Sequence, residues 1–123
     1  MAQVAVNTYE RAQHEARDAA VFDLARMTFG DRSLEREVLQ LFDRQSELLL
    51  ERMRTSEPAA IATLAHTLKG SAVGIGAKRV ASAAAEVEAT AQAKPGEMSR
   101  AIDELAQAVE EARAEISALI RAH

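Results

Sequence analysis

Apolar residues recur at three- and four-residue spacing from residue 34 onward, which predicts amphipathic α-helices rather than strands. The first long stripe covers five helical turns between residues 34 and 53, while Leu39 and Leu50 lie off it. Ser33 stands just before this run and is predicted to cap the helix. The members of the stripe are Leu34, Val38, Leu41, Phe42, Gln45, Leu48, Leu49 and Met53.

Three further stripes follow, separated by short breaks at residues 55–58, 74–76 and 94–96. Pro58 suits the first turn of a helix, and the glycines Gly74 and Gly76 are expected to end that helix. Lys94, Pro95 and Gly96 predict a turn. The stripes are Ile61, Leu64, Ala65, Leu68, Ala72 and Ile75; then Val80, Ala84, Val87 and Ala91; then Ile102, Leu105, Val109, Ala112, Ile116 and Leu119 or Ile120.

A shorter apolar stripe lies near the amino terminus and predicts a short helix over residues 18–29. It consists of Val21, Leu24, Ala25 and Thr28, flanked by Phe22 and Phe29, and Gly30 and Asp31 stop it. Residues 1–17 are polar and predict a loosely ordered arm or a short helix. Long helices with short connections favour an all-α fold. We therefore expect an antiparallel up-down four-helix bundle with a short N-terminal accessory helix, forming one domain over residues 18–123.

Composition and charge exclude several classes of protein. The 123-residue chain has no cysteine, so it carries neither a disulfide framework nor thiolate chemistry. Its net charge of −4 argues against nucleic-acid binding, which needs clustered Lys and Arg. No apolar run reaches the length of a membrane span, and the first residues do not resemble a secretory signal. We expect a cytoplasmic protein that binds no membrane.

His66 is predicted to face solvent in the middle of the third helix. At 100° per residue it lies roughly 160° from the centre of the stripe around Leu64 and Leu68. Ala62, Gly70 and Val73 share this outward face with His66, as does Lys69. An isolated histidine in such a position is usually an ordinary surface residue.

Gly70 argues against that ordinary reading, because glycine inside a helix costs about 1 kcal/mol relative to alanine. Small residues one turn on either side of the imidazole leave room for another protein to approach closely. Lys69 supplies a cation within reach of the ring. An exposed nucleophile, a cation and a cleared surface suit the transfer of an anionic group such as a phosphoryl group.

The run HTLKGSAVGIGA, which contains His66, Leu68, Lys69, Gly70, Ser71 and Gly76, resembles the signature of histidine-containing phosphotransfer (HPt) domains. The resemblance continues through Val80, Ala81, Ala84 and the pair Val87–Glu88, and it covers about residues 18–121. It implies an accessory helix on a four-helix bundle. It also implies a histidine that accepts a phosphoryl group from a receiver-domain aspartate and passes it to another receiver.

Roles for individual residues follow from the outward face together with this resemblance. His66 would be the nucleophile through Nε2, Lys69 would offset phosphoryl charge, and Gly70 would admit the partner. Glu88 lies at the edge of the next stripe, where related domains place a side chain that holds Nδ1–H; a solvated surface acid is the equal alternative. Ser71 is expected to be structural.

The resemblance also implies the partners: response-regulator receiver domains and a hybrid sensor histidine kinase, in a bacterial phosphorelay. We expect a monomer that needs no cofactor of its own, with Mg²⁺ bound only by the partner receiver. The alternative is an adaptor module that docks receivers or kinases without transfer, but such proteins typically lose the histidine. A third possibility is a fragment resembling the phosphorylated domain of a chemotaxis kinase.

The docking surface is expected to surround His66 and to include apolar residues. Ala62, Gly70 and Val73 supply part of it on the third helix. Leu39 and Leu50, which lie off the core stripe of the second helix, are the candidates there. If residues 18–29 cover them, they belong to the core instead.

Two other kinds of site are not supported by the sequence. GSAVGIG lacks the third glycine of a dinucleotide loop, since position 79 is arginine, and no GK[ST] run is present. Without an ATP site, we do not expect a kinase or another enzyme. The three histidines, His14, His66 and His123, are too far apart to predict a metal site by spacing.

Overall fold

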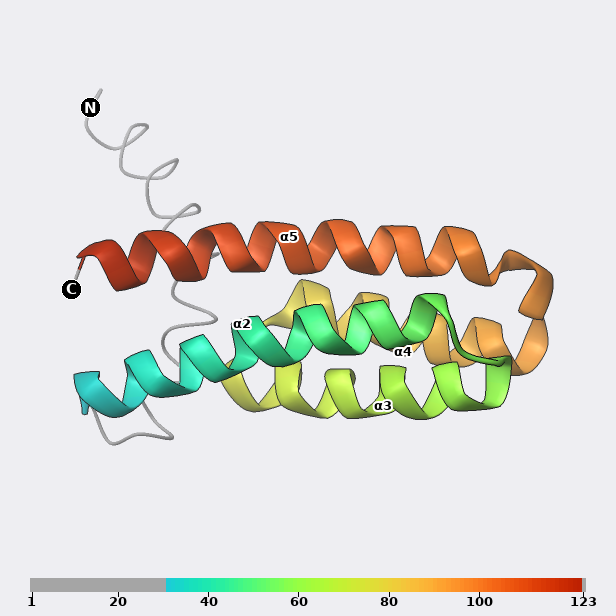
Figure 1. Cartoon of the computed structure of the whole chain (residues 1–123), viewed down its shortest axis with the longest axis horizontal. Helices are drawn as coiled ribbons and strands as arrows, with labels where there is room; N and C mark the ends of the chain where they lie inside the picture. Colours follow the sequence, from blue (N-terminus) through green and yellow to red (C-terminus); the bar gives the residue numbers. More distant parts are fainter. Residues whose placement is uncertain (1–30, 123) are drawn as a thin grey trace, which may run out of the picture.

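The structure is a computed structural model that describes residues 31–122. It contains helices α2 (Arg32–Arg54), α3 (Pro58–Ile75), α4 (Lys78–Ala93) and α5 (Met98–Ala122), and the short 3₁₀ helix η1 (Pro95–Glu97). The four α-helices run along the long axis of the molecule in alternating directions (Figure 1). The predicted helix over 18–29 and the arm over 1–17 lie outside the described residues.

Each long helix packs against its neighbours in the chain, and α5 closes the bundle by packing against both α2 and α4. No strand occurs in residues 31–122. The predicted all-α class and the antiparallel up-down bundle are thereby confirmed.

Capping residues explain where α2 begins and where α3 ends, and the cap of α2 differs from the predicted one. The N-cap of α2 is Asp31, whose side chain accepts a hydrogen bond from the backbone N–H of Leu34 at 3.0 Å; the prediction of Ser33 as the cap was wrong. Helix α3 continues through Gly74 and ends at Gly76, whose φ of 80° is left-handed. Glycine enters that region without steric penalty, which turns the chain directly into α4.

The predicted core stripes of α3, α4 and α5 are confirmed. Every member is buried or packs half-buried against the core, and Leu68, Ala84, Val87 and Leu105 are fully enclosed. Helices α3 and α4 pack against each other more extensively than any other pair in the bundle. Alanines at buried positions on both helices, Ala65, Ala72, Ala84 and Ala91, let the two backbones approach. Side chains that project from adjacent edges of α3 and α4 can therefore touch.

The predicted stripe of α2 was wrong in part: Phe42, Leu49 and Met53 are buried as predicted, but the rest of the core line differs. Its buried residues are Leu39, Phe42, Ser46, Leu49 and Met53, whereas Leu34, Leu41 and Leu48 are exposed. Ser46 is a polar residue at the centre of the true core line, where its hydroxyl donates to the carbonyl of Asp43 at 3.0 Å. Because that hydrogen bond satisfies the hydroxyl, serine is tolerated in the core.

Ion pairs fix the rotation of α2 about its own axis relative to α5. Arg113 Nε donates to Asp43 Oδ1 at 2.6 Å, and this bond is the main reason why the pKa of Arg113 is raised. Arg54 bonds Asp103 at 3.0 Å on the same flank. At 100° per residue, Leu41 lies about 200° from Asp43, so the exposed leucines are on the flank of α2 that faces away from α5.

Candidate functional site

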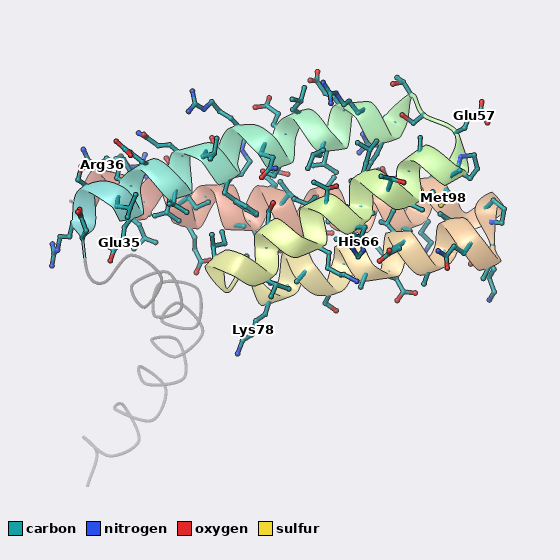
Figure 2. All side chains as sticks on the ribbon, turned by 90° about the horizontal axis from the view of Figure 1, so that it is seen from below. Glu35, Arg36, Glu57, His66, Lys78 and Met98 are labelled. Carbon is teal, nitrogen blue, oxygen red and sulfur yellow. The ribbon has the colours of Figure 1, made fainter. Side chains whose placement is uncertain are left out.

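His66 lies in the middle of α3 on its outward face, near α4, as Figure 2 shows with α3 in front. Its side chain is 66% exposed, which confirms the outward position expected from the helical periodicity. The residues one turn before and after it, Ala62 and Gly70, are small. A partner can therefore approach the ring directly.

The structure places Glu88 beside His66, as the resemblance implied. Helix α4 carries Glu88 one residue after the fully buried Val87, which sets it at the edge of α4 next to α3. Glu88 Oε2 lies 2.9 Å from Nδ1 of His66. The Glu88 side chain is 25% exposed and contacts the ring, unlike the freely solvated surface acid of the alternative.

Lys69 completes a three-residue cluster. Its ammonium donates to the other carboxylate oxygen, Glu88 Oε1, at 3.1 Å, so Glu88 holds one partner on each oxygen. From the sequence, Lys69 was expected to serve a phosphoryl group; in the structure its ammonium is engaged with Glu88. No pattern in the sequence indicates this pairing, because the two residues are on different helices.

The pKa of Glu88 is lowered from its ordinary value of 4.5, chiefly by the hydrogen bond from Lys69 and further by the charges of Lys69 and His66. At neutral pH Glu88 is therefore a carboxylate, which can only accept hydrogen bonds. Nδ1 of His66 must then carry the proton in their contact. In the neutral imidazole this leaves Nε2, at the far end of the ring, with its lone pair free.

The outward face of α3 is almost free of formal charge. Lys69 is its one Lys or Arg, and the helix contains no Asp or Glu. Val73 is 64% exposed one turn beyond Lys69, and a Cβ added at Gly70 would meet no atom within 4 Å. These features make a smooth surface around His66, to which the exposed Gly70 and Val73 belong, while Ala62 is half-buried and packs against the core.

The docking role predicted for Leu39 is wrong, whereas that of Leu50 stays a prediction. Leu39 is 8% exposed and belongs to the core, so it is not available to a partner. Leu50 is half-buried and packs against the core. The exposed apolar residues of α2 are instead Leu34, Leu41 and Leu48, at 42%, 60% and 47% exposure. Their regular seven-residue spacing is present in the sequence, where helical periodicity alone predicts core positions.

Leu48 is the exposed leucine of α2 that lies nearest the level of His66. Helices α2 and α3 are antiparallel and meet at the turn of residues 55–57. Leu48 is eight residues before Ser56 and Leu64 is eight residues after it, so Leu48 and Leu64 lie at about the same height in the bundle. His66 is half a turn beyond Leu64.

No group of three or more metal-ligating side chains lies together within the described part of the chain. None of the described helices combines the length and the apolar run needed to cross a bilayer.

Comparison with known proteins agrees with this geometry. The family model described as Hpt domain matches residues 35–120, which is more than two thirds of the chain. No curated protein and no solved structure matches the chain. The chain belongs to the Hpt domain family. Its role is thus related to histidine phosphotransfer in phosphorelays, where Hpt domains act as phosphocarrier modules rather than kinases and interact with receiver domains and kinases.

Proposed function

We propose that this protein is a phosphorelay intermediate that accepts a phosphoryl group on His66 from a receiver-domain aspartate and passes it to another response regulator. One observation carries the proposal: the 2.9 Å contact between Nδ1 of His66 and the Glu88 carboxylate. This contact holds the ring in the orientation and tautomer that leave Nε2 nucleophilic, on a side chain that is 66% exposed.

The transfer step uses the lone pair of Nε2. It attacks the phosphorus of the partner's aspartyl phosphate, the P–O bond to the aspartate breaks, and the carboxylate leaves with the bonding electrons. The product is a phosphoramidate at Nε2. Nδ1 keeps its proton, and the positive charge that develops on the ring is offset by Glu88 beside it. Return of the phosphoryl group to a second aspartate reverses these steps.

Lys69 supports the reaction in two ways. In the resting site it holds Glu88 as a carboxylate through the 3.1 Å hydrogen bond. Its ammonium, one helical turn from His66, also supplies positive charge near the incoming phosphoryl oxygens. Neither role requires a cofactor on this chain, and Mg²⁺ belongs to the receiver partner.

The proposed partners are receiver domains of response regulators and a hybrid sensor histidine kinase in the cytoplasm of a bacterium, with this protein acting as a monomer. Gly70 and Ala62 give access to the ring. Val73 on α3 and Leu48 on α2 supply exposed apolar area close to it. Burial of this apolar area against a partner would favour docking.

The alternative is an adaptor that docks receivers without transfer. Phosphotransfer profiling separates the two functions: the purified protein is mixed with labelled, phosphorylated receiver domains from the same genome. The proposal predicts acid-labile, base-stable label on the wild type and none on His66→Gln. Stable binding of a receiver without any label on the wild type would establish the adaptor instead.

A further inference from the structure

A groove with cationic walls runs between the amino-terminal half of α2 and the carboxy-terminal half of α5, which lie at the same end of the bundle (Figure 1). Its volume is about 460 Å³, which is in the range of ligand sites in proteins. Its walls include three arginines, Arg44, Arg113 and Arg121, but one acid, Asp43. The groove is therefore positively charged on a chain whose net charge is −4.

The three arginines differ in their partners. Arg113 is engaged, because it donates to Asp43 at 2.6 Å and pairs with Glu47 at 3.3 Å. Arg44 and Arg121 are exposed and form no ion pair with another residue of the described range 31–122. Their positive charges are therefore available to an anionic group of another molecule.

Arg44 and Arg121 stand toward opposite ends of the groove. Arg36 Nη2 donates to the backbone carbonyl of Ile120 at 3.2 Å, so these two residues are nearly level in the antiparallel pair of helices. Arg121 is then level with about position 35 of α2, nine residues before Arg44. At 1.5 Å per residue, the two arginines are about 13.5 Å apart along the bundle axis.

The floor of the groove between these two arginines is apolar, and its rims are polar. Ile116 is 5% exposed and Ile120 packs half-buried against the core. Gln40 on α2 and Ser117 on α5 are exposed along the rims. Amide and hydroxyl side chains both donate and accept hydrogen bonds, so they can satisfy the backbone of a peptide chain lying in the groove.

We propose that this groove binds an extended acidic segment of a partner protein, with one carboxylate on Arg44 and another on Arg121. An extended chain rises about 3.3 Å per residue, so side chains four residues apart lie on one face about 13 Å from each other. The segment thus carries two acids at positions i and i+4 and an apolar residue at i+2, above Ile116. A small anion would reach one of the two arginines and leave the other unpaired.

The groove lies across the bundle from the His66 site. Helix α2 packs mainly on α3 and α5, and α4 does the same, so the α2–α5 flank is opposite the α3–α4 edge where His66 meets Glu88. The acidic segment and a receiver can therefore bind at the same time. In the phosphorelay role proposed above, on which this consequence alone rests, a partner held by its acidic segment stays near His66 at a raised effective concentration.

An NMR titration of the isotope-labelled full chain tests the proposal. The probe is the synthetic peptide acetyl-Ser-Glu-Ser-Leu-Ser-Glu-Ser-amide, and its control carries Gln in place of both Glu residues. At low ionic strength, where attraction between exposed charges is strongest, the acidic peptide should shift the backbone amide signals of Gln40 and Ser117. The Gln peptide should not shift them, and the signal of Gly70, beside His66, should stay in place.

Arginine variants then locate the bound carboxylates. Arg44→Gln and Arg121→Gln should each weaken binding of the acidic peptide by about threefold to fivefold, the effect of losing one exposed ion pair. Arg52→Gln is the matched control, since it removes an exposed arginine of α2 outside the groove and should bind as the wild type does. His66→Gln should also bind normally, so peptide binding and phosphotransfer are tested independently.

Four other results would contradict the proposal. Equal binding of the Gln peptide would mean that the groove does not recognise carboxylates. An equal loss in Arg52→Gln would indicate general attraction between opposite charges. Acetate that binds as tightly as the peptide would reveal a site for an isolated carboxylate rather than for a chain. Shifts that are absent, or that centre on Gly70, would show that the segment does not occupy this groove.

Discussion

Glu88 on α4 accepts a hydrogen bond from Nδ1 of His66 on α3 at 2.9 Å, across the most extensively packed helix pair of the bundle. The contact exists because buried alanines bring the two helices together and because Val87, next to Glu88, is anchored in the core. A reactive side chain that is mostly exposed thereby acquires a fixed orientation.

His66→Gln is expected to abolish phosphoryl uptake and to leave the fold intact. The ring is largely exposed, so its removal takes away little packing and should leave the fold intact. Uptake should be lost because no other histidine lies in the described bundle. The measurement is transfer of label from a phosphorylated receiver, with thermal denaturation as the check on folding. Acid-labile phosphate on the Gln variant would refute the assignment of His66.

Glu88→Ala is expected to slow phosphotransfer by roughly tenfold, since a hydrogen bond to a charged group contributes about 1.5 kcal/mol at the lower end of its range. Glu88→Gln, which keeps an acceptor oxygen but no charge, should fall between Ala and wild type. Single-turnover transfer rates measure the effect. Glu86→Ala, an exposed acid on the same helix, is the control and should match the wild type.

The lowered pKa of Glu88 predicts how this carboxylate's contribution to the stability of the fold depends on pH. Because the folded-state pKa is lowered below 4.5, the ionised carboxylate stabilises the fold fully above that pH, and this contribution is lost as pH falls through the lowered value. Lys69→Met removes the main cause of the lowering, so the titration of Glu88 should move upward. NMR titration of the Glu88 carboxyl carbon tests this; an unchanged pKa in Lys69→Met would contradict it.

Gly70 is expected to give a partner access to His66 rather than to stabilise the fold. Its Cβ position is open, so Gly70→Ala should stabilise the protein by about 1 kcal/mol or less. Gly70→Gln should keep the fold but slow transfer from a receiver, because the longer side chain projects beside His66. Ala114→Gln on α5 is the matched control. Equal transfer rates for wild type and Gly70→Gln would remove the steric argument.

Leu39 and Leu48 are a matched pair on α2 with opposite expected effects. Leu39→Ala should destabilise the bundle by about 2–4 kcal/mol, because it opens a cavity in the core. Leu48→Ala should change the thermal midpoint little and weaken receiver binding, measured by titration calorimetry. If Leu48→Ala binds receivers as the wild type does, α2 takes no part in docking through this residue.

The sequence by itself determined the helical class, the core faces of α3, α4 and α5, and the outward position of His66. In each of those helices the largest apolar side chains recur mainly along one stripe, so the 3.6-residue period favours one orientation. Gly70 beside His66 and the surrounding motif were enough to indicate phosphotransfer.

Tertiary structure decided the orientation of α2 and the contacts of Glu88. Leucines occur all round α2, so local periodicity allows two faces to be core, and only packing against α3 and α5 selects the line through Leu39 and Ser46. Tertiary packing also decides the hydrogen bonds from Lys69 and His66 to Glu88. Those residues are about twenty positions apart in the chain, and their distance depends on how closely two helices pack, which no pattern within one helix specifies.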